Sequence, residues 1–160
     1  MKGHTAALAL LGALLATPAL FATPAWADHG CEGVRAAGTS KLTVLVSGIR
    51  TPRGEVAITL YPDNKRKFMA KSGKLIRVRR TAAASVRVCF WLPPANYAAA
   101  VYHDADGDRD FDRTLVGMPA EGFGFSNNPE TTLGLPSLSS ARFRLAPGDG
   151  SVSIQMRYLR

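Results

Sequence analysis

Residues 85–103 read SVRVCFWLPPANYAAAVYH, and this stretch indicates two β-strands joined by a turn. The first segment, 85–92, alternates in polarity, so that Val86, Val88 and Phe90 share one face of a strand. The second segment, 97–103, is small or apolar almost throughout, as expected of a strand that is buried on both faces. The Pro-Pro-Ala-Asn sequence between them favours a turn. We therefore expect a β-rich fold with residues 97–103 in its interior.

Similar short runs lie on both sides of this stretch. Residues 42–49 and 55–61 flank a Pro-Arg-Gly turn and predict a hairpin. Residues 62–73 are polar and basic and predict a surface excursion or a short helical turn. In all, the sequence predicts seven strands, at residues 42–49, 55–61, 74–80, 85–92, 97–103, 141–145 and 151–159. Seven short strands without a convincing amphipathic helix predict an all-β fold, an antiparallel β-sandwich.

The composition agrees with one compact domain. The chain has 160 residues, of which 46% are hydrophobic and 20% charged, so it has enough apolar surface for a core and is not expected to be disordered. The 15 glycines and 10 prolines disfavour long helices. The two cysteines exclude a zinc ribbon and a cysteine-rich knot. Beyond the N-terminus, no apolar run is long enough to span a membrane.

Residues 1–27 have the features of a signal peptide. A basic start is followed by an apolar run, then by prolines and the triplet Ala25-Trp26-Ala27, which suits a signal peptidase. We expect cleavage near Ala27, which would place the mature protein in the periplasm or outside the cell. Residues 28–40 then form a flexible mature N-terminus, and residues 41–160 form the sandwich domain.

The two cysteines have two interpretations. In an oxidising compartment Cys31 and Cys89 form the one possible disulfide, which would tie the N-terminus to a central strand. Alternatively, Cys89 is a buried thiol and Cys31 is free.

Residues 104–112, which we call the acidic loop, hold five of the twelve acidic residues in an otherwise basic chain. Oxygen ligands at alternate positions suit Ca²⁺, so we predict a calcium site; its candidate ligands are Asp104, Asp106, Asp108, Asp110 and Asp112. Two positions differ from a helix-loop-helix calcium site: Arg109 replaces the usual glycine, and Leu115 replaces the bidentate glutamate. The alternative is a solvated acidic turn balanced by nearby arginines.

The segment after the acidic loop combines glycines, aromatic rings and amides. It could be a ligand platform, with Phe123 and Phe125 for stacking and Asn127 and Asn128 for hydrogen bonds. The interpretation we favour is a loop whose phenylalanines plug one end of the sandwich while the glycines adopt positive φ.

Catalytic residues are harder to identify. No Gly-x-Ser-x-Gly elbow is present, and His103 is more typical of a hydrogen-bonded strand end than of a general base. A metal-dependent hydrolase that uses the 103–128 region would need His103 and Glu121 to converge on a pocket beside the aspartates. We therefore favour a protein that is not an enzyme.

The net charge of +8 allows a further alternative, a surface that binds polyanions. Its densest basic groups are residues 65–67 and Arg77, Arg79 and Arg80, although a solvated face explains them equally well. Export and the absence of a recognised motif disfavour nucleic acid as a partner.

The stretches 92–108, 111–112 and 116–128, together with 46–61, resemble the bacterial secreted domain family of unknown function numbered 2141. The resemblance covers about residues 41–158, and its most specific part is Glu-Gly-Phe-Gly-Phe-Ser-Asn at 121–127. The family usually has a glycine where Arg109 stands. The resemblance implies a transthyretin-like or immunoglobulin-like sandwich, no established activity and no catalytic residues.

Together these observations predict an exported binding or structural module of the cell envelope with a calcium-binding loop. Its ligand is unknown; an anionic glycan or lipopolysaccharide suits its charge.

Overall fold

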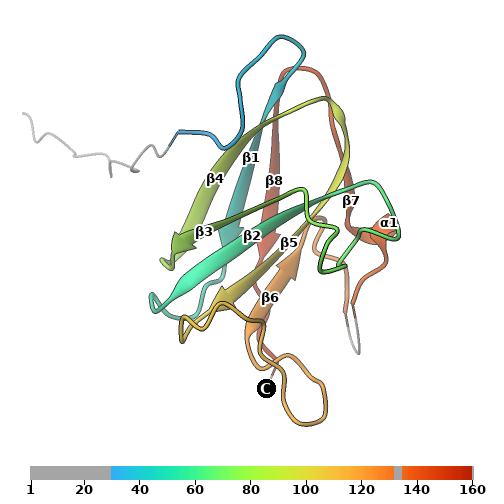
Figure 1. Ribbon diagram of the computed structural model, residues 1–160. Coiled ribbons are helices and arrows are strands. Elements are labelled where there is room, and N and C mark those ends of the chain that lie inside the picture. The colour runs from blue at the N-terminus through green and yellow to red at the C-terminus, as the bar shows by residue number, and fades with distance from the viewer. Residues whose placement is uncertain (1–29, 132–134, 160) are drawn as a thin grey trace, which may run out of the picture.

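The computed structural model describes residues 30–131 and 135–159, and it confirms the predicted all-β sandwich (Figure 1). The expected signal peptide at 1–27 lies outside the described residues. Seven of the eight strands overlap the predicted segments. The elements are β1 Ser40–Ser47, β2 Glu55–Pro62, β3 Ile76–Thr81, β4 Ser85–Leu92, β5 Ala95–Asp104, β6 Gly122–Phe125, α1 Leu138–Ala141, β7 Arg142–Leu145 and β8 Asp149–Gln155.

The strands form a three-stranded sheet and a five-stranded sheet, packed face to face. The smaller sheet has the order β4-β1-β8, and its β1–β8 pair is parallel, whereas the other pairs are antiparallel. In the larger sheet, β3-β2-β5 continues into two short strands that share the far edge of β5. β7 pairs with Ala95–Ala98 and β6 with Ala100–His103.

The predicted hairpin between residues 42–49 and 55–61 is wrong. β1 pairs with β4 and β8, and β2 pairs with β3 and β5, so the two strands lie in different sheets. Residues 48–54 carry the chain from one sheet to the other. Polarity alternation fixes which face of a strand is buried but does not identify its neighbour, and both strands satisfy their pattern by facing the same interior.

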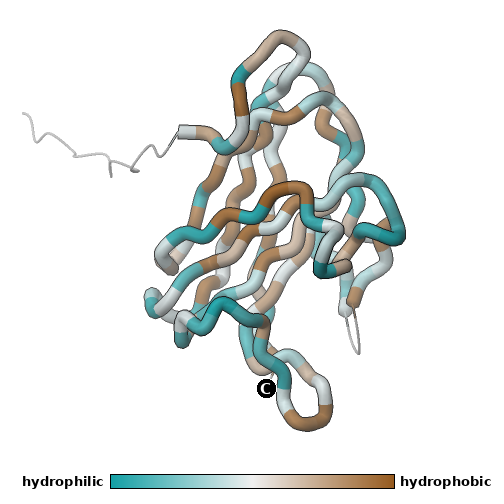
Figure 2. Tube along the Cα trace, viewed as in Figure 1, coloured by the Kyte–Doolittle hydropathy of each residue, from teal (hydrophilic) through white to brown (hydrophobic). Residues whose placement is uncertain are grey.

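The main core fills the space between the sheets. Val44, Ile58, Phe90 and Ile154, one residue from each of four strands, are all fully buried in it. Along β1 and β4, buried residues alternate with less buried ones, and Figure 2 shows the hydropathy of the residues in these strands. Val86, Val88 and Phe90 of β4 are all buried in the core, so the predicted common face of these three residues is confirmed.

The larger sheet is covered on its outer face as well. β5 is buried along almost its whole length, as predicted. β2 is buried on both faces, since Ala57, Thr59 and Tyr61 on its outer face are buried as well as Val56, Ile58 and Leu60. A second apolar cluster covers this face, and Phe68 and Met69 of the segment 63–75 pack against it. That segment, the β2–β3 loop, folds as turns over the sheet rather than away from it.

The strand that the sequence did not predict, β6, allows the two sheets to approach each other. A Cβ atom added at Gly124 would lie 2.8 Å from Ile154 Cγ2 and 2.9 Å from the Gln155 carbonyl oxygen. Beyond β8 the chain crosses to the larger sheet, where Phe123 and Arg157 exchange backbone hydrogen bonds of 2.8 and 2.9 Å. The glycines of the GFGF sequence thus permit a close approach that a side chain would prevent.

The N-terminal segment is attached to the edge of the smaller sheet. Cys31 and Cys89 form a disulfide, and Glu32 exchanges backbone hydrogen bonds with Cys89 and Trp91 on β4. β4 is an edge strand and not a central one, and the segment protects part of its open edge. A structural disulfide is typical of oxidising compartments, so it is compatible with a location outside the cytoplasm. In the described part of the chain, no helix is long and apolar enough to cross a membrane.

Candidate functional site

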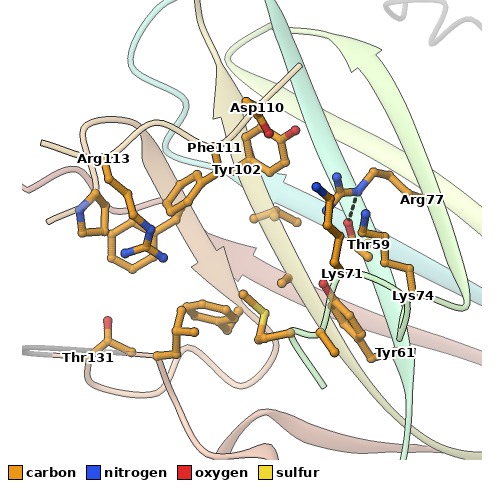
Figure 3. Close-up of a pocket in the computed structure, with 18 of the residues that line it drawn as sticks. Thr59, Tyr61, Lys71, Lys74, Arg77, Tyr102, Asp110, Phe111, Arg113 and Thr131 are labelled. Atoms are coloured by element: carbon orange, nitrogen blue, oxygen red, sulfur yellow. Dashed lines mark hydrogen bonds between the residues drawn. The ribbon is translucent and has the colours of Figure 1, made fainter. Parts of the chain in front are cut away.

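A pocket of about 640 Å³ lies on the outer face of the five-stranded sheet (Figure 3). Its floor consists of outward-facing residues of β2, β5 and β6. Ala100 on β5 lies opposite Thr59 on one side and Phe125 on the other, so a methyl group stands where a larger side chain would fill the space. This volume is within the range of small-molecule binding sites.

Two loops form most of the walls of the pocket. The β2–β3 loop stands on one side. Residues 105–121, the β5–β6 loop, stand on the other side and begin with residues 105–112 of the acidic loop. The wall residues are Met69, Ala70, Lys71 and Lys74 from the first loop, and Asp110, Phe111, Arg113, Gly117, Met118 and Pro119 from the second; Thr131, Leu135 and Leu159, which follow β6 in the chain, also line the pocket.

Aromatic rings line the floor and the second wall in a continuous series. The ring centroids of Tyr102 and Phe111 are 5.6 Å apart, those of Phe111 and Phe123 are 6.4 Å apart, and those of Phe123 and Phe125 are 6.0 Å apart. All three pairs have edge-to-face geometry, which is favourable for aromatic rings. The pocket therefore has a preformed apolar surface suited to a flat ring.

Cationic groups stand around the opening. Lys71, Lys74 and Arg77 gather at one side, and Arg113 lies at the opposite side (Figure 3). Asp110 is the one carboxylate among the described lining residues. Arg77 lowers the pKa of Lys74, with smaller contributions in the same direction from desolvation and from Lys71. The cations are thus close enough to disfavour one another's charge, and an anion among them would relieve that repulsion.

Arg77 is held in place by the sheet. Its Nε donates a hydrogen bond of 2.8 Å to Thr59 Oγ1, and its guanidinium carbon lies 5.4 Å from the centroid of the Tyr102 ring. These contacts hold the side chain beside Thr59 at one side of the pocket, as Figure 3 shows. An arginine fixed in this way presents its planar donors with little loss of entropy on binding.

The acidic loop is organised around Asp104, which is fully buried. Its carboxylate accepts hydrogen bonds from the backbone N–H groups of Gly107 (2.8 Å) and Arg109 (3.0 Å), and Arg79 pairs with it at 2.5 Å. Arg79 also donates to the Tyr102 hydroxyl and to the Arg109 carbonyl. Asp104 therefore holds the loop against the sheet.

Arg109, where a calcium loop usually has glycine, adopts the left-handed backbone conformation, with φ of 70°. Gly107 is also left-handed, with φ of 83°. The loop thus makes its sharp turn at the expected position despite the arginine. The Asp104 carboxylate and the Arg79 side chain hold the two polar backbone atoms of Arg109 in this conformation.

Three of the five candidate calcium ligands come together. One carboxylate oxygen from each of Asp104, Asp106 and Asp108 lies within 4.8 Å of the others. Asp106 and Asp108 are exposed, and each accepts a hydrogen bond from a backbone N–H two residues further along. Asp110 lines the pocket instead.

Asp112, the fifth candidate, lies beside Glu121. The Glu121 carboxylate accepts backbone N–H groups from Ala105 (3.2 Å) and Asp112 (3.2 Å), so it joins the two ends of the acidic loop. Burial raises the pKa of Glu121, and the charges of Asp104 and Asp112 raise it further. The hydrogen bonds from the backbone N–H groups of Asp112 and Ala105 each lower the pKa, but by less than burial raises it. The pKa of Asp112 is also raised, by desolvation first and then by the neighbouring aspartates. This end of the loop concentrates negative charge.

His103 belongs to the core and not to the pocket. It is buried, its Nδ1 lies 2.8 Å from the Tyr158 hydroxyl, and its Nε2 lies 2.7 Å from the Arg53 carbonyl oxygen. Both ring nitrogens are therefore engaged. Its partners differ from those of Glu121, which binds the backbone of the acidic loop. The two residues that the hydrolase hypothesis requires have no hydrogen-bonding partner in common.

The side chains of Asn127 and Asn128 form hydrogen bonds with backbone groups. Asn127 and Asn128 have φ of 64° and 47°, and asparagine tolerates this left-handed region better than most residues. Asn127 Nδ2 donates to the carbonyl oxygens of Ser140 (3.1 Å) and Arg142 (2.6 Å). Asn128 accepts from the Gln155 N–H at 2.8 Å. Phe123 and Phe125, in contrast, line the pocket.

The basic residues of β3 have partners within the protein. Arg79 pairs with Asp104, and Arg80 pairs with Glu32 at 2.6 Å. Arg77 reaches the pocket. A strand with these pairs presents less free positive charge to a polyanion than its sequence suggests.

Comparison with protein-family models gives one match: domain-of-unknown-function family 2141, described as an uncharacterized protein conserved in bacteria, matches residues 44–155. The chain belongs to this family. No match was found among curated proteins or among solved structures. The stretch matched by family 2141 contains β2 to β8, all of the acidic loop and most of the pocket.

Several pocket residues of this family 2141 domain were not candidates from the sequence. Lys71, Lys74 and Arg113 are isolated basic residues in loops, so no local pattern distinguishes them from solvated charges. A usable signal was present in the strands: Tyr61 and Tyr102 lie on the face opposite the main core, where large aromatic residues need a covering segment.

Proposed function

We propose that the protein is a binding module of the cell envelope that holds a small ligand in the outer-face pocket. The observation that carries this proposal is the pocket itself, about 640 Å³ over a floor that keeps alanine at its centre and aromatic rings around it. A sheet face that needed only protection from water would be filled by the side chains of its covering loops. The disulfide and the signal-peptide pattern of residues 1–27 support the envelope location.

Binding without chemistry is the better interpretation of the lining. Its described residues include no histidine, cysteine or serine, and Asp110 is their one carboxylate. General acid–base catalysis needs positioned groups whose pKa values suit proton transfer near neutral pH. His103 does not line the pocket, and both of its ring nitrogens form hydrogen bonds with other groups.

We also propose that Ca²⁺ binds the acidic loop. Around one ion with Ca–O distances of about 2.3–2.6 Å, ligand oxygens lie up to roughly 5 Å apart. The carboxylate oxygens of Asp104, Asp106 and Asp108, which lie within 4.8 Å of one another, are therefore close enough to share one ion. A carboxylate has about four lone-pair sites; at Asp104, Gly107, Arg109 and Arg79 use three, which leaves one for an ion. A bound ion would stiffen the loop that forms one wall of the pocket.

Blocking the pocket tests the proposed binding function. In Ala100→Phe, a ring would occupy the floor, whereas Ala83→Phe places the same ring in an exposed turn. A library of small organic fragments is screened by two-dimensional amide NMR. We expect hits that shift the amides of β2, β5 and β6 in the wild type and in Ala83→Phe, and no such hits in Ala100→Phe. Hits that persist in Ala100→Phe, or no hits at these strands in the wild type, would contradict the proposal.

Calorimetry tests the calcium site. Ca²⁺ is titrated into chelator-treated wild type, the double variant Asp106→Asn, Asp108→Asn, and Asp149→Asn, which removes an exposed carboxylate from β8 far along the chain. We expect binding heat and a higher melting temperature in the wild type and in Asp149→Asn, and neither in the double variant. If the wild type gives no heat and its melting temperature is unchanged, the acidic loop is a solvated turn.

A further inference from the structure

We infer that the outer-face pocket selects small organic anions with a flat apolar body, such as an aromatic carboxylate. This inference rests on the proposed binding function and gives its ligand class. It follows from the way in which the lining is divided: the aromatic rings lie on the floor and on one wall, and the cationic groups stand at the opening.

The apolar part of the lining fits a ring. Phe123 contacts Phe111 and Phe125 edge to face, with centroids 6.4 and 6.0 Å apart, and all three rings line the pocket. Ala100 leaves space above the sheet between these rings and Tyr61. A planar apolar group placed there would bury its surface without displacing a side chain.

The charged part of the lining fits an anion. Three cations lie on one side of the opening, Lys71, Lys74 and Arg77, and Arg113 lies on the other side. Among the described lining residues, Asp110 is the one carboxylate that offsets these positive charges. The three clustered cations are exposed, so an anion can reach them from solvent. Arg77 first, and Lys71 to a smaller extent, lower the pKa of Lys74, because neighbouring positive charges repel one another.

Arg77 is the residue best placed to orient the anion. Thr59 fixes its Nε at 2.8 Å, and the Tyr102 ring lies beneath its guanidinium. Its remaining N–H donors can form two parallel hydrogen bonds with a carboxylate. The anionic group would therefore lie beside β3, with the apolar body extending towards Phe123 and Phe125.

Three naphthalene derivatives of nearly equal size separate charge from shape: naphthoate, naphthamide and naphthylmethylammonium carry a negative, a neutral and a positive substituent. Their dissociation constants are measured by fluorescence titration at low salt. We expect naphthoate to bind about tenfold more tightly than naphthamide, and naphthylmethylammonium to bind most weakly. If naphthamide or the cation binds as well as naphthoate, the inference is wrong although the pocket is a binding site. If none of the three binds, the proposed binding function itself fails for ring-shaped ligands.

Variants identify the groups responsible. Arg77→Gln and Lys71→Gln should each weaken naphthoate binding more than naphthamide binding, and so reduce the preference for naphthoate. Lys65→Gln is the matched control, because it removes the same charge from the β2–β3 loop at an exposed position outside the pocket. An equal loss of preference in Lys65→Gln would show that net charge, and not the pocket, attracts the anion. If Arg77→Gln fails to fold, Lys71→Gln still decides the question.

Discussion

At the scale of single residues, Arg109 has a backbone conformation that its side chain does not favour. Its φ is 70°, whereas the side chain is exposed, so substitutions there report mainly on the backbone. We expect Arg109→Gly to raise the free energy of unfolding by about 0.5–1 kcal/mol and Arg109→Val to lower it by about 1 kcal/mol. Urea denaturation measures both. Ala105→Gly, at a position without positive φ, should lower the stability instead; a gain there would show that glycine stabilises the loop for another reason.

Lys74 makes anion binding dependent on pH. Its pKa is lowered by Arg77, by desolvation and by Lys71, against the opposing effect of Asp110. An anion favours the protonated amine, so naphthoate affinity should be highest below the pKa of Lys74 and should decline as the pH rises through it. The decline should be at most about fivefold, because the pair is exposed. In titrations from neutral to alkaline pH, Lys74→Gln should lack this component; an identical pH profile in the variant would contradict the role of Lys74.

At the scale of elements, β6 depends on its glycines. A methyl group at Gly124 would overlap Ile154 and the Gln155 carbonyl, and one at Gly122 would lie 2.3 Å from the Tyr158 ring. We expect Gly124→Ala to lower the free energy of unfolding by about 1–3 kcal/mol. Gly30→Ala is the control, since nothing lies within 4 Å of its added methyl group. Equal stabilities of the two variants in thermal or urea denaturation would mean that the sheets adjust at no cost.

The same elements explain how far the sequence predicts the fold. Alternation in 85–92 and continuous burial in 97–103 identify β4 and β5, because each pattern reflects the local surroundings of a strand. The neighbours of β1 could not be predicted, because β4 and β8 lie far along the chain. The alternation of polar and apolar residues shows which face of a strand is buried, but it does not show which strand pairs with it. The GFGF sequence of β6 is typical of a loop, because glycines that allow the close approach of two sheets cannot be distinguished in sequence from glycines that allow turns.

At the scale of the whole molecule, the disulfide links two distant parts of the chain and closes a covalent loop. Cys31 and Cys89 are 58 residues apart, and the chain-entropy model gives the bond about 4 kcal/mol of stabilisation. Reduction, or the double variant Cys31→Ser, Cys89→Ser, should lower the free energy of unfolding by that order and release the N-terminal segment from β4. Hydrogen exchange at the Trp91 amide, which donates to Glu32, should then accelerate. Unchanged exchange would show that backbone pairing alone holds the segment.

The candidate site was predictable in part. The acidic loop is visible in the sequence because its five aspartates are neighbours along the chain. The pocket is assembled from four strands, two loops and residues near the C-terminus. Whether Phe123 and Phe125 plug an end of the sandwich or line a pocket depends on what covers the sheet. Tertiary packing decides between these two roles of the phenylalanines, and a local sequence pattern gives no information about tertiary packing.

A structure of the mature protein crystallised with naphthoate would test the central claim most directly. The account predicts density for the naphthalene ring over Phe123 and Phe125, with the carboxylate beside Arg77 and Lys71. Naphthoate bound at any other surface, or with its carboxylate directed away from these cations, would contradict it.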